Sequence, residues 1–127
     1  MTFEERKKLA RSFLGKTVHI GIDRPIGYIH QKEKYTLEYK INYGFIPDVK
    51  GGDDEELDVY LLGVDVPVSE YDAKIIAIVH RENDIEDKLV GAPPNMSFDK
   101  EEIAKQVEFQ EKYYITYVET MEENMSK

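Results

Sequence analysis

The sequence predicts a single, mainly β domain: a small barrel or sandwich of five strands with one helix at each end of the chain. Two observations carry this prediction. Short apolar segments alternate with turn residues over residues 17–92, and helix-capping patterns begin the segments on either side. The chain has 127 residues, which is the length of one ordinary domain. We therefore expect residues 1–127 to form one domain.

Five segments carry the strand signal, and turn residues such as those of DRPIG separate them. They are KTVHIGI (16–22), TLEYKI (36–41), LDVYLLGV (57–64), AKIIAIVH (73–80) and KLVGA (88–92). These segments are rich in β-branched, aromatic or other apolar residues, and TLEYKI alternates apolar with polar positions. Short strands at this spacing favour a barrel or a sandwich.

The N-terminal segment is predicted to be a helix. Thr2 and Glu5 have the spacing of a capping box, and Gly15 is a typical helix stop. Apolar residues share roughly one face of it, namely Phe3, Ala10, Phe13 and Leu14. That face is expected to dock on the body of the domain or on another subunit.

A second helix is predicted to begin near Ser97 or Asp99, because Asp99 and Glu102 form another capping-box pattern. Residues that would pack on the sheet recur at helical spacing, namely Ile103, Val107, Gln110, Tyr114 and Tyr117. The polar end VETMEENMSK (118–127) is expected to fray.

Composition excludes several classes of function. The formal net charge of −9 opposes non-specific binding to nucleic acid. Cysteine is absent from the chain, which excludes disulfides, thiolate catalysis and cysteine-based zinc sites. The sequence has no apolar run of roughly 18 residues that would span a membrane, and its charged N-terminus has no apolar secretory core. We therefore expect a cytoplasmic protein without nucleic-acid or membrane partners.

The stretch NYGFIPDVKGGDDEELDVYLLG (42–63) concentrates carboxylates in a glycine-rich turn that leads into an apolar strand. Charged turns are commonly solvated loops, and the spacing does not fit an EF-hand. Asp58, however, lies within LDVYLL, where a buried carboxylate without a partner costs several kcal/mol. Asp53, Glu55 and Asp58 can converge on a small volume, where a hard cation such as Mg²⁺ would neutralise them.

Three motifs, taken in order, resemble the soluble family I inorganic pyrophosphatases. They are NYGF followed by the acidic run DDEELDV (53–59), the segment IEDKLVGAP (85–93) and, more weakly, FQEKYY (109–114). The resemblance covers about residues 17–117 and implies a five-stranded OB-like barrel with flanking helices. It also implies Mg²⁺-dependent hydrolysis of pyrophosphate to two phosphates, with Mn²⁺ as a substitute ion, and assembly into homo-oligomers.

By position, the resemblance makes Asp53, Asp58 and Glu86 ligands of the metal ions. Glu55 takes the place of the carboxylate that helps to activate the attacking water. Lys88 is implied to hold a phosphate group as a point charge.

Tyr43 and Tyr113 match tyrosines that hydrogen-bond the substrate or product phosphate. The ligand assigned to Glu86 is ambiguous by one residue, with Asp87 as the alternative. Side chains two apart on a strand share a face, so Glu86 and Lys88 would both point into the site. We therefore prefer Glu86.

Several positions depart from the family pattern. Glu55 and Glu86 stand where the family usually has Asp, and a shift of about 1 Å can lower a rate roughly 100-fold. Arg81 stands where the family has a further acidic ligand. Glu82 or Asp84 would replace that ligand only if this loop is aligned differently with the family pattern.

The largest departure is a shortened hairpin, compressed here into residues 23–41. Basic residues in it are candidate phosphate contacts, namely Arg24, His30, Lys32 and Lys34. Asp23 would replace a metal-site Glu of the family only in a shifted register.

His19 and His80 are expected to be structural or surface residues, because the histidines have no zinc-site spacing. Tyr28, Tyr35 and Tyr39 are expected in the barrel or an interface. Two other functions stay open. One is hydrolysis of another phosphoanhydride or a phosphate ester, and the other is non-catalytic binding of metal or phosphate.

Overall fold

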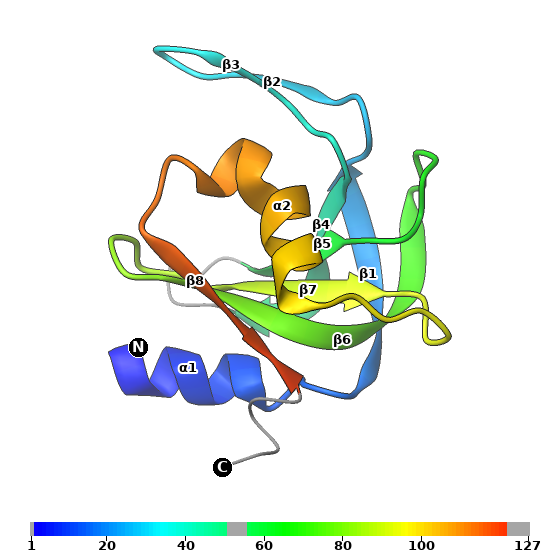
Figure 1. The fold of residues 1–127 in the computed structure, drawn as a ribbon, viewed down its shortest axis with the longest axis vertical. Helices are drawn as coiled ribbons and strands as arrows, with labels where there is room; N and C mark the ends of the chain where they lie inside the picture. The colour runs from blue at the N-terminus through cyan, green and yellow to red at the C-terminus, as the bar shows by residue number, and fades with distance from the viewer. Residues whose placement is uncertain (1, 51–55, 122–127) are drawn as a thin grey trace.

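The computed structural model describes residues 2–50 and 56–121, and these form two helices and eight strands (Figure 1). In chain order they are α1 (Phe3–Arg11), β1 (Thr17–Arg24), β2 (Ile29–Gln31), β3 (Thr36–Glu38), β4 (Asn42–Lys50), β5 (Glu56–Leu61), β6 (Glu70–Arg81), β7 (Lys88–Ala92), α2 (Lys100–Glu111) and β8 (Thr116–Thr120). Within this described part of the chain, neither helix is long and apolar enough to cross a membrane.

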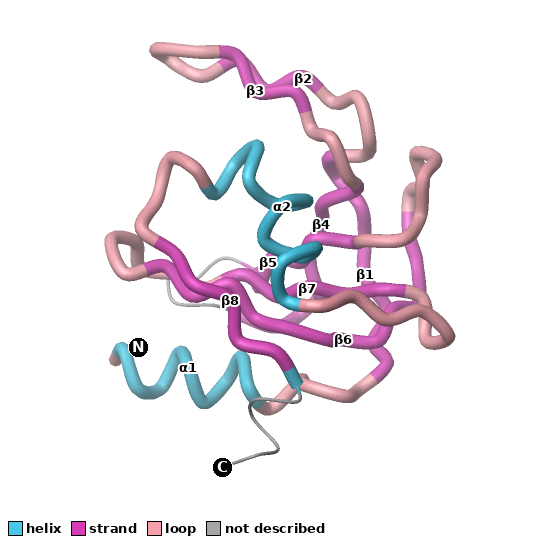
Figure 2. Tube along the Cα trace, viewed as in Figure 1, coloured by secondary structure: helices cyan, strands magenta, loops and turns pink. Residues whose placement is uncertain are grey.

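Five of these strands close into a barrel. Neighbours follow the order β1, β4, β5, β7 and β6, and β6 pairs again with β1. The pairs are antiparallel except for β5 with β7. β8 pairs with β6 outside the ring, so it extends the sheet rather than the barrel. The predicted five-stranded OB-like barrel with a helix at each end is confirmed (Figure 2).

Side chains alternate between two apolar clusters on the two faces of the sheet. Along β5, Leu57, Val59 and Leu61 lie in the cluster inside the barrel. Tyr60 and the following Leu62 lie in the second cluster, which includes apolar residues of α2. This alternation is the period of two that a strand buried on both faces requires.

One predicted strand, TLEYKI, is wrong as a barrel strand. Residues 36–38 instead pair with β2 in a separate two-stranded hairpin that projects beyond the barrel (Figures 1 and 2). Leu37 and Tyr39 are buried in the cluster under α2, so their alternation reflects packing there.

The barrel strand in this region is β4, which begins within NYGF. Gly44 is needed there because a Cβ at this position would lie 1.7 Å from the backbone oxygen of Gly21 on β1. The close approach of these two strands therefore explains the glycine of the motif.

Both predicted capping boxes are confirmed, Thr2 with Glu5 on α1 and Asp99 with Glu102 on α2. Helix α1 ends earlier than expected, at Arg11, and the chain then turns before Gly15 adopts a positive φ of 84°. The early end follows from the fold, because the turn brings the Gly15 N–H to the Ile75 oxygen on β6.

The predicted continuation of the second helix to Tyr117 is wrong. Helix α2 ends at Glu111, and Tyr117 lies in β8, where it pairs with His80 of β6. The segment TYVET (116–120) is rich in β-branched and aromatic residues, and β6 offers it an edge to pair with. Strand pairing therefore takes precedence over the helical spacing of its tyrosines.

Candidate active site

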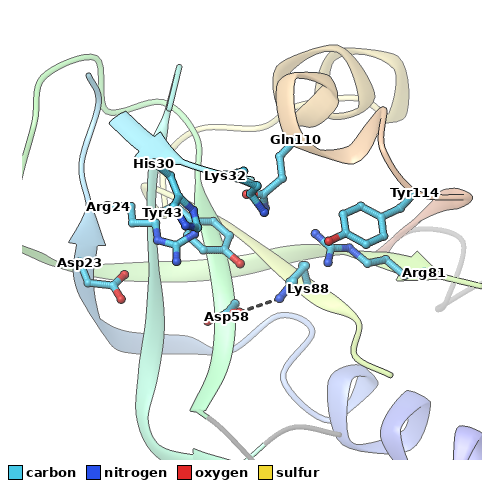
Figure 3. Close-up of a pocket in the computed structure, with 10 residues that line it drawn as sticks. All are labelled: Asp23, Arg24, His30, Lys32, Tyr43, Asp58, Arg81, Lys88, Gln110 and Tyr114. Atoms are coloured by element: carbon cyan, nitrogen blue, oxygen red, sulfur yellow. Dashed lines mark hydrogen bonds and ion pairs between the residues drawn. The ribbon is translucent and has the colours of Figure 1, made fainter. Parts of the chain in front are cut away.

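A polar cavity of about 210 Å³ opens between the barrel, the β2–β3 hairpin and the C-terminal end of α2 (Figure 3). Its lining residues come from seven elements and the turns beside them. They are Asp23, Arg24, His30, Lys32, Tyr43, Asp58, Arg81, Lys88, Gln110 and Tyr114. The fold thus brings chemically active side chains from most of the chain to one place.

Lys88, at the start of β7, lies between two carboxylates. Its Nζ is 2.6 Å from Asp58 Oδ2 and 2.5 Å from Glu86 Oε1, and Glu86 is only 2% exposed. Burial disfavours the charged lysine, but the attraction of Asp58 and Glu86 outweighs it and raises the Lys88 pKa. Lys88 is therefore a fixed positive charge in the cavity wall.

Further cations surround the same space. Burial lowers the pKa of Lys32, and the charges of Arg24, Arg81 and Lys88 lower it further. Burial and the charges of Arg24 and Lys32 likewise lower the pKa of His30, so its imidazole is neutral at pH 7. Like charges that converge in this way repel one another unless an anion lies between them.

Arg81 is held rigidly in the cavity wall. Its guanidinium donates to both carboxylate oxygens of Glu111, at 2.9 and 2.5 Å, and to Asp84 at 2.8 Å. The Tyr114 ring lies against it, 3.7 Å from the guanidinium carbon to the ring centroid. Burial opposes the charge, but the hydrogen bonds that the guanidinium donates to Glu111 keep the Arg81 pKa above its ordinary value. Where an acidic ligand was expected, this residue therefore places a guanidinium that is paired with Glu111 and Asp84.

Two carboxylates lie on the opposite side of the cavity. Asp23 on β1 points toward Asp58 on β5 (Figure 3). Partial burial raises the Asp23 pKa, and the negative charges of Asp58 and Glu56 raise it further. From the sequence, Asp23 matched a metal-site Glu of the family only if the alignment was shifted. In the structure, Asp23 lines the cavity together with Asp58.

These two carboxylates are the candidate metal ligands among the residues that line the cavity. Among residues 2–50 and 56–121, no group of three or more histidines, aspartates or glutamates is arranged to hold a metal ion. Asp23 and Asp58 nevertheless face the cavity together, and Mg²⁺ commonly binds through one or two carboxylates plus substrate phosphates. The pair fits a Mg²⁺ ion that arrives with a phosphate ligand. Asp58 and Glu86 both bind Lys88, but Glu86 fits less well because its side chain is 2% exposed, against 27% for Asp58.

Glu86 and Asp87, the two residues before β7, point to opposite sides of the chain. Glu86 binds Lys88 on the cavity side. Asp87 accepts from the Arg81 backbone N–H and binds His80 and Arg6 on the side facing α1. Of the two residues, Glu86 is therefore the one beside the site.

Of the two tyrosines predicted to contact phosphate, one lines the cavity and the other does not. Tyr43 lines the cavity, and burial and the charge of Asp58 raise its pKa well above the ordinary value. Its hydroxyl therefore stays protonated and able to donate. Tyr113 is 42% exposed and does not line the cavity, whereas Tyr114 does. Asp53 and Glu55 lie outside the described residues.

Sequence reasoning missed Gln110 as a site residue. It lies on the apolar stripe of α2 at only 5% exposure, accepts from the Tyr39 hydroxyl and donates to that of Tyr60. A polar residue on an apolar stripe was the signal that could have identified it. Lys34, by contrast, is exposed and does not line the cavity.

The expectations for two histidines are confirmed. His19 is exposed, and its Nδ1 lies 2.7 Å from Asp72 Oδ1. His80 is 1% exposed and hydrogen-bonded, with Nδ1 3.1 Å from Asp87 Oδ2 and Nε2 2.8 Å from Glu119 Oε1. Both are therefore structural or surface residues outside the cavity.

No protein-family model matches the chain, and no curated protein sequence matches it significantly. Solved structures, however, resemble it over most of its length. An inorganic pyrophosphatase from Ehrlichia chaffeensis superposes with a TM-score of 0.65 at 16% identity, covering 86% of this chain and 88% of that one. One from Coxiella burnetii has a TM-score of 0.63 at 17% identity, with 89% and 91% covered. One from Neisseria gonorrhoeae has a TM-score of 0.59 at 23% identity, with 88% and 87% covered. This chain therefore has the fold of the inorganic pyrophosphatases.

Proposed function

We propose that the protein hydrolyses inorganic pyrophosphate to two phosphates in this cavity. The observation that carries the proposal is the convergence of Arg24, Lys32, Arg81 and Lys88 on a cavity of about 210 Å³. Pockets for drug-sized ligands are usually larger, about 300 Å³ or more, so a small, highly charged anion suits this one. The shared fold with structures titled inorganic pyrophosphatases supports the same substrate.

The side chains suggest a division of labour. Lys88 and Lys32 would bind phosphate oxygens as point charges, and Arg24 would add hydrogen bonds in a planar fork. The protonated Tyr43 hydroxyl would donate to a phosphate oxygen. Water attacks one phosphorus atom, the bond from that phosphorus to the bridging oxygen breaks, and the second phosphate leaves with the bridging oxygen. One proton of the water stays on the attacked phosphate as a hydroxyl, and the other ends on the departing phosphate. Fixed cations stabilise the charge that develops on the oxygens during this transfer.

A Mg²⁺ ion is part of the proposal, with Mn²⁺ as its substitute. Asp58 and Asp23 would hold it, and Asp53 and Glu55 keep the roles that the family resemblance implies, as metal ligand and as helper of the attacking water. Such an ion lowers the pKa of bound water and neutralises phosphoryl oxygens. Glu86 would contribute by holding Lys88 in place, since its carboxylate lies 2.5 Å from the ammonium.

The test is phosphate release from pyrophosphate by the purified protein, with Mg²⁺, with Mn²⁺ and with a chelator. We expect metal-dependent release by the wild type and its loss in Asp58→Asn. Asp65→Asn is the matched control, because Asp65 is exposed and does not line the cavity. Equal activity of the wild type and Asp58→Asn would overturn the assigned site.

A second function is favoured by one observation. Lys88 keeps its positive charge beside Asp58 and Glu86, and Arg24 and Lys32 add further cations to the wall, so the described cavity can attract an anion even without metal. Binding of pyrophosphate without phosphate release would indicate a non-catalytic phosphate-binding protein. Faster release from a nucleotide or a polyphosphate would instead indicate a hydrolase of another phosphoanhydride.

A further inference from the structure

Tyr35 and Tyr113 join two parts of the protein that are distant in sequence. Tyr35 lies in the turn of the β2–β3 hairpin, and Tyr113 follows the C-terminal end of α2. Their rings are stacked, with centroids 4.2 Å apart and planes inclined by 14°. An offset or stacked pair of this kind stabilises a contact beyond the area it buries.

One end of the hairpin is anchored to the body of the protein, because Leu37 is buried in the cluster under α2. The hairpin strands pair with each other in a two-stranded sheet that is separate from the barrel sheet. Figure 1 shows it projecting past α2, away from the barrel. A contact at its turn therefore has a large effect on where the turn lies.

The same turn carries Lys32 into the cavity. The Lys32 backbone N–H donates to the Tyr35 oxygen at 2.9 Å, so the two residues are fixed relative to each other. The Lys32 side chain lines the cavity together with Arg24, Arg81 and Lys88 (Figure 3). Burial and the positive charges of Arg24, Arg81 and Lys88 disfavour the charged form of Lys32 here, so the place of its side chain depends on the hairpin that carries it.

We propose that the Tyr35–Tyr113 stack is a positioning contact, which holds the hairpin turn so that Lys32 stays in the cavity. The inference rests on the proposed function, since it takes the cavity as the phosphate site. It assigns Tyr113 a role through Lys32 rather than through contact with the substrate. Tyr35 and Tyr113 are therefore positioning residues, and Lys32 makes the contact with the phosphate.

The first test measures how tightly variants bind imidodiphosphate, which is pyrophosphate with nitrogen as the bridging atom. It shows whether the Tyr35–Tyr113 stack contributes to affinity for the anion. We expect Tyr113→Ala to weaken binding roughly twofold to tenfold, because an aromatic pair contributes about that much. Tyr113→Phe should bind like the wild type, since the stack needs the ring and not the hydroxyl. The control is Ile115→Ala, because this neighbouring side chain is 60% exposed and does not line the cavity.

A double-mutant cycle separates positioning from direct contact. If Tyr113 acts through Lys32, then Tyr113→Ala combined with Lys32→Ala should bind no more weakly than Lys32→Ala alone. Independent, additive losses would overturn the inference, and so would wild-type affinity in Tyr113→Ala.

Hydrogen exchange of the hairpin amides in the free protein gives a readout that needs no ligand. We expect Tyr113→Ala to speed exchange over residues 29–38, where strand pairing protects the wild type, and Tyr113→Phe to leave it unchanged. Unchanged exchange in Tyr113→Ala would overturn the positioning role. Failure of the wild type to bind imidodiphosphate would instead overturn the proposed function, so the two failures are distinguishable.

Discussion

Lys88 Nζ lies 2.6 Å from Asp58 Oδ2, and this ion pair joins β7 to β5 at the base of the cavity. The lysine side chain is 8% exposed and that of Asp58 is 27% exposed. The pair explains how a carboxylate is tolerated within the apolar run LDVYLL. A carboxylate in this run was expected to need a partner, and among the described residues Lys88 is a partner of Asp58.

Removing Lys88 should therefore destabilise the protein as well as inactivate it. Lys88→Met would remove the ammonium that binds the 2%-exposed Glu86, and breaking such a buried pair costs about 3–5 kcal/mol. Urea unfolding at neutral pH measures the loss in free energy of unfolding. Lys34→Met is the control, because Lys34 is exposed and does not line the cavity. A loss no greater than that of the control would show that Lys88 does not compensate Glu86.

Asp87 should make stability depend on acid pH. Burial opposes its charge, but hydrogen bonds from His80 and the Arg81 backbone N–H, with the charge of Arg6, hold its pKa below the ordinary 3.8. A lowered folded pKa contributes stability that is complete above the unfolded value and is lost as pH falls through the folded one. Asp87→Asn should thus cost roughly 1–3 kcal/mol at neutral pH.

The difference between wild type and Asp87→Asn should shrink as pH falls below 3.8, the ordinary value for an aspartate. Urea titrations at a series of pH values measure it, with the exposed Asp65→Asn as control. A difference that stays constant across this range would mean that the charge of Asp87 contributes nothing.

Lys32 should make phosphate binding depend on alkaline pH. Its pKa lies below the ordinary 10.5 because of burial and the charges of Arg24, Arg81 and Lys88. Only the protonated lysine attracts the anion, so affinity for imidodiphosphate should begin to fall as pH rises toward 10.5. Lys32→Arg keeps its charge there and should hold its affinity further into the alkaline range.

Calorimetric titration at neutral and alkaline pH compares the two proteins. Lys34→Arg is the matched control on the same hairpin, because its side chain does not line the cavity. Identical pH profiles for wild type and Lys32→Arg would remove Lys32 from the anion site.

Gly44→Ala should prevent the barrel from closing. Its Cβ would lie 1.7 Å from the Gly21 backbone oxygen, and backbone cannot move aside as a flexible side chain can. Gly27→Ala is an informative comparison, since Gly27 has a positive φ of 91° but no atom within 4 Å of a new Cβ. We expect the second variant to lose only about 1–2 kcal/mol.

Solubility, circular dichroism and urea unfolding of both variants measure the effect. A folded Gly44→Ala protein as stable as Gly27→Ala would show that β1 and β4 separate more easily than this close approach suggests.

Local patterns in the sequence determined much of the fold. Both capping boxes are contacts between residues three apart, so they need no tertiary information. The sides on which Glu86 and Asp87 lie agree with the two-residue period of a strand, since Glu86 binds Lys88 and Asp87 binds His80. The choice of Glu86 over Asp87 as a metal ligand stays a prediction. The helix near each end likewise follows from short-range signals, as do the strands over KTVHIGI, LDVYLLGV, AKIIAIVH and KLVGA.

Only the tertiary structure decided which apolar segments pair. The alternation in TLEYKI suits a barrel strand and a hairpin under α2 equally well, and contact with β1 selected β4 for the barrel. The spacing of Tyr114 and Tyr117 suits a helix, yet pairing with β6 made the last segment a strand. These choices depend on which edges the rest of the chain leaves available.

The composition of the cavity was likewise a tertiary outcome. Arg24, Lys32 and Lys88 belong to different elements, and barrel closure and hairpin position bring them together. The turn after α2 places Tyr114 against Arg81 and leaves Tyr113 to stack on Tyr35. The sequence by itself determined which residues can carry charge, cap a helix or fill a strand. The three-dimensional path of the chain decided which of these charges meet, because charges act through distance in space and not through separation in sequence.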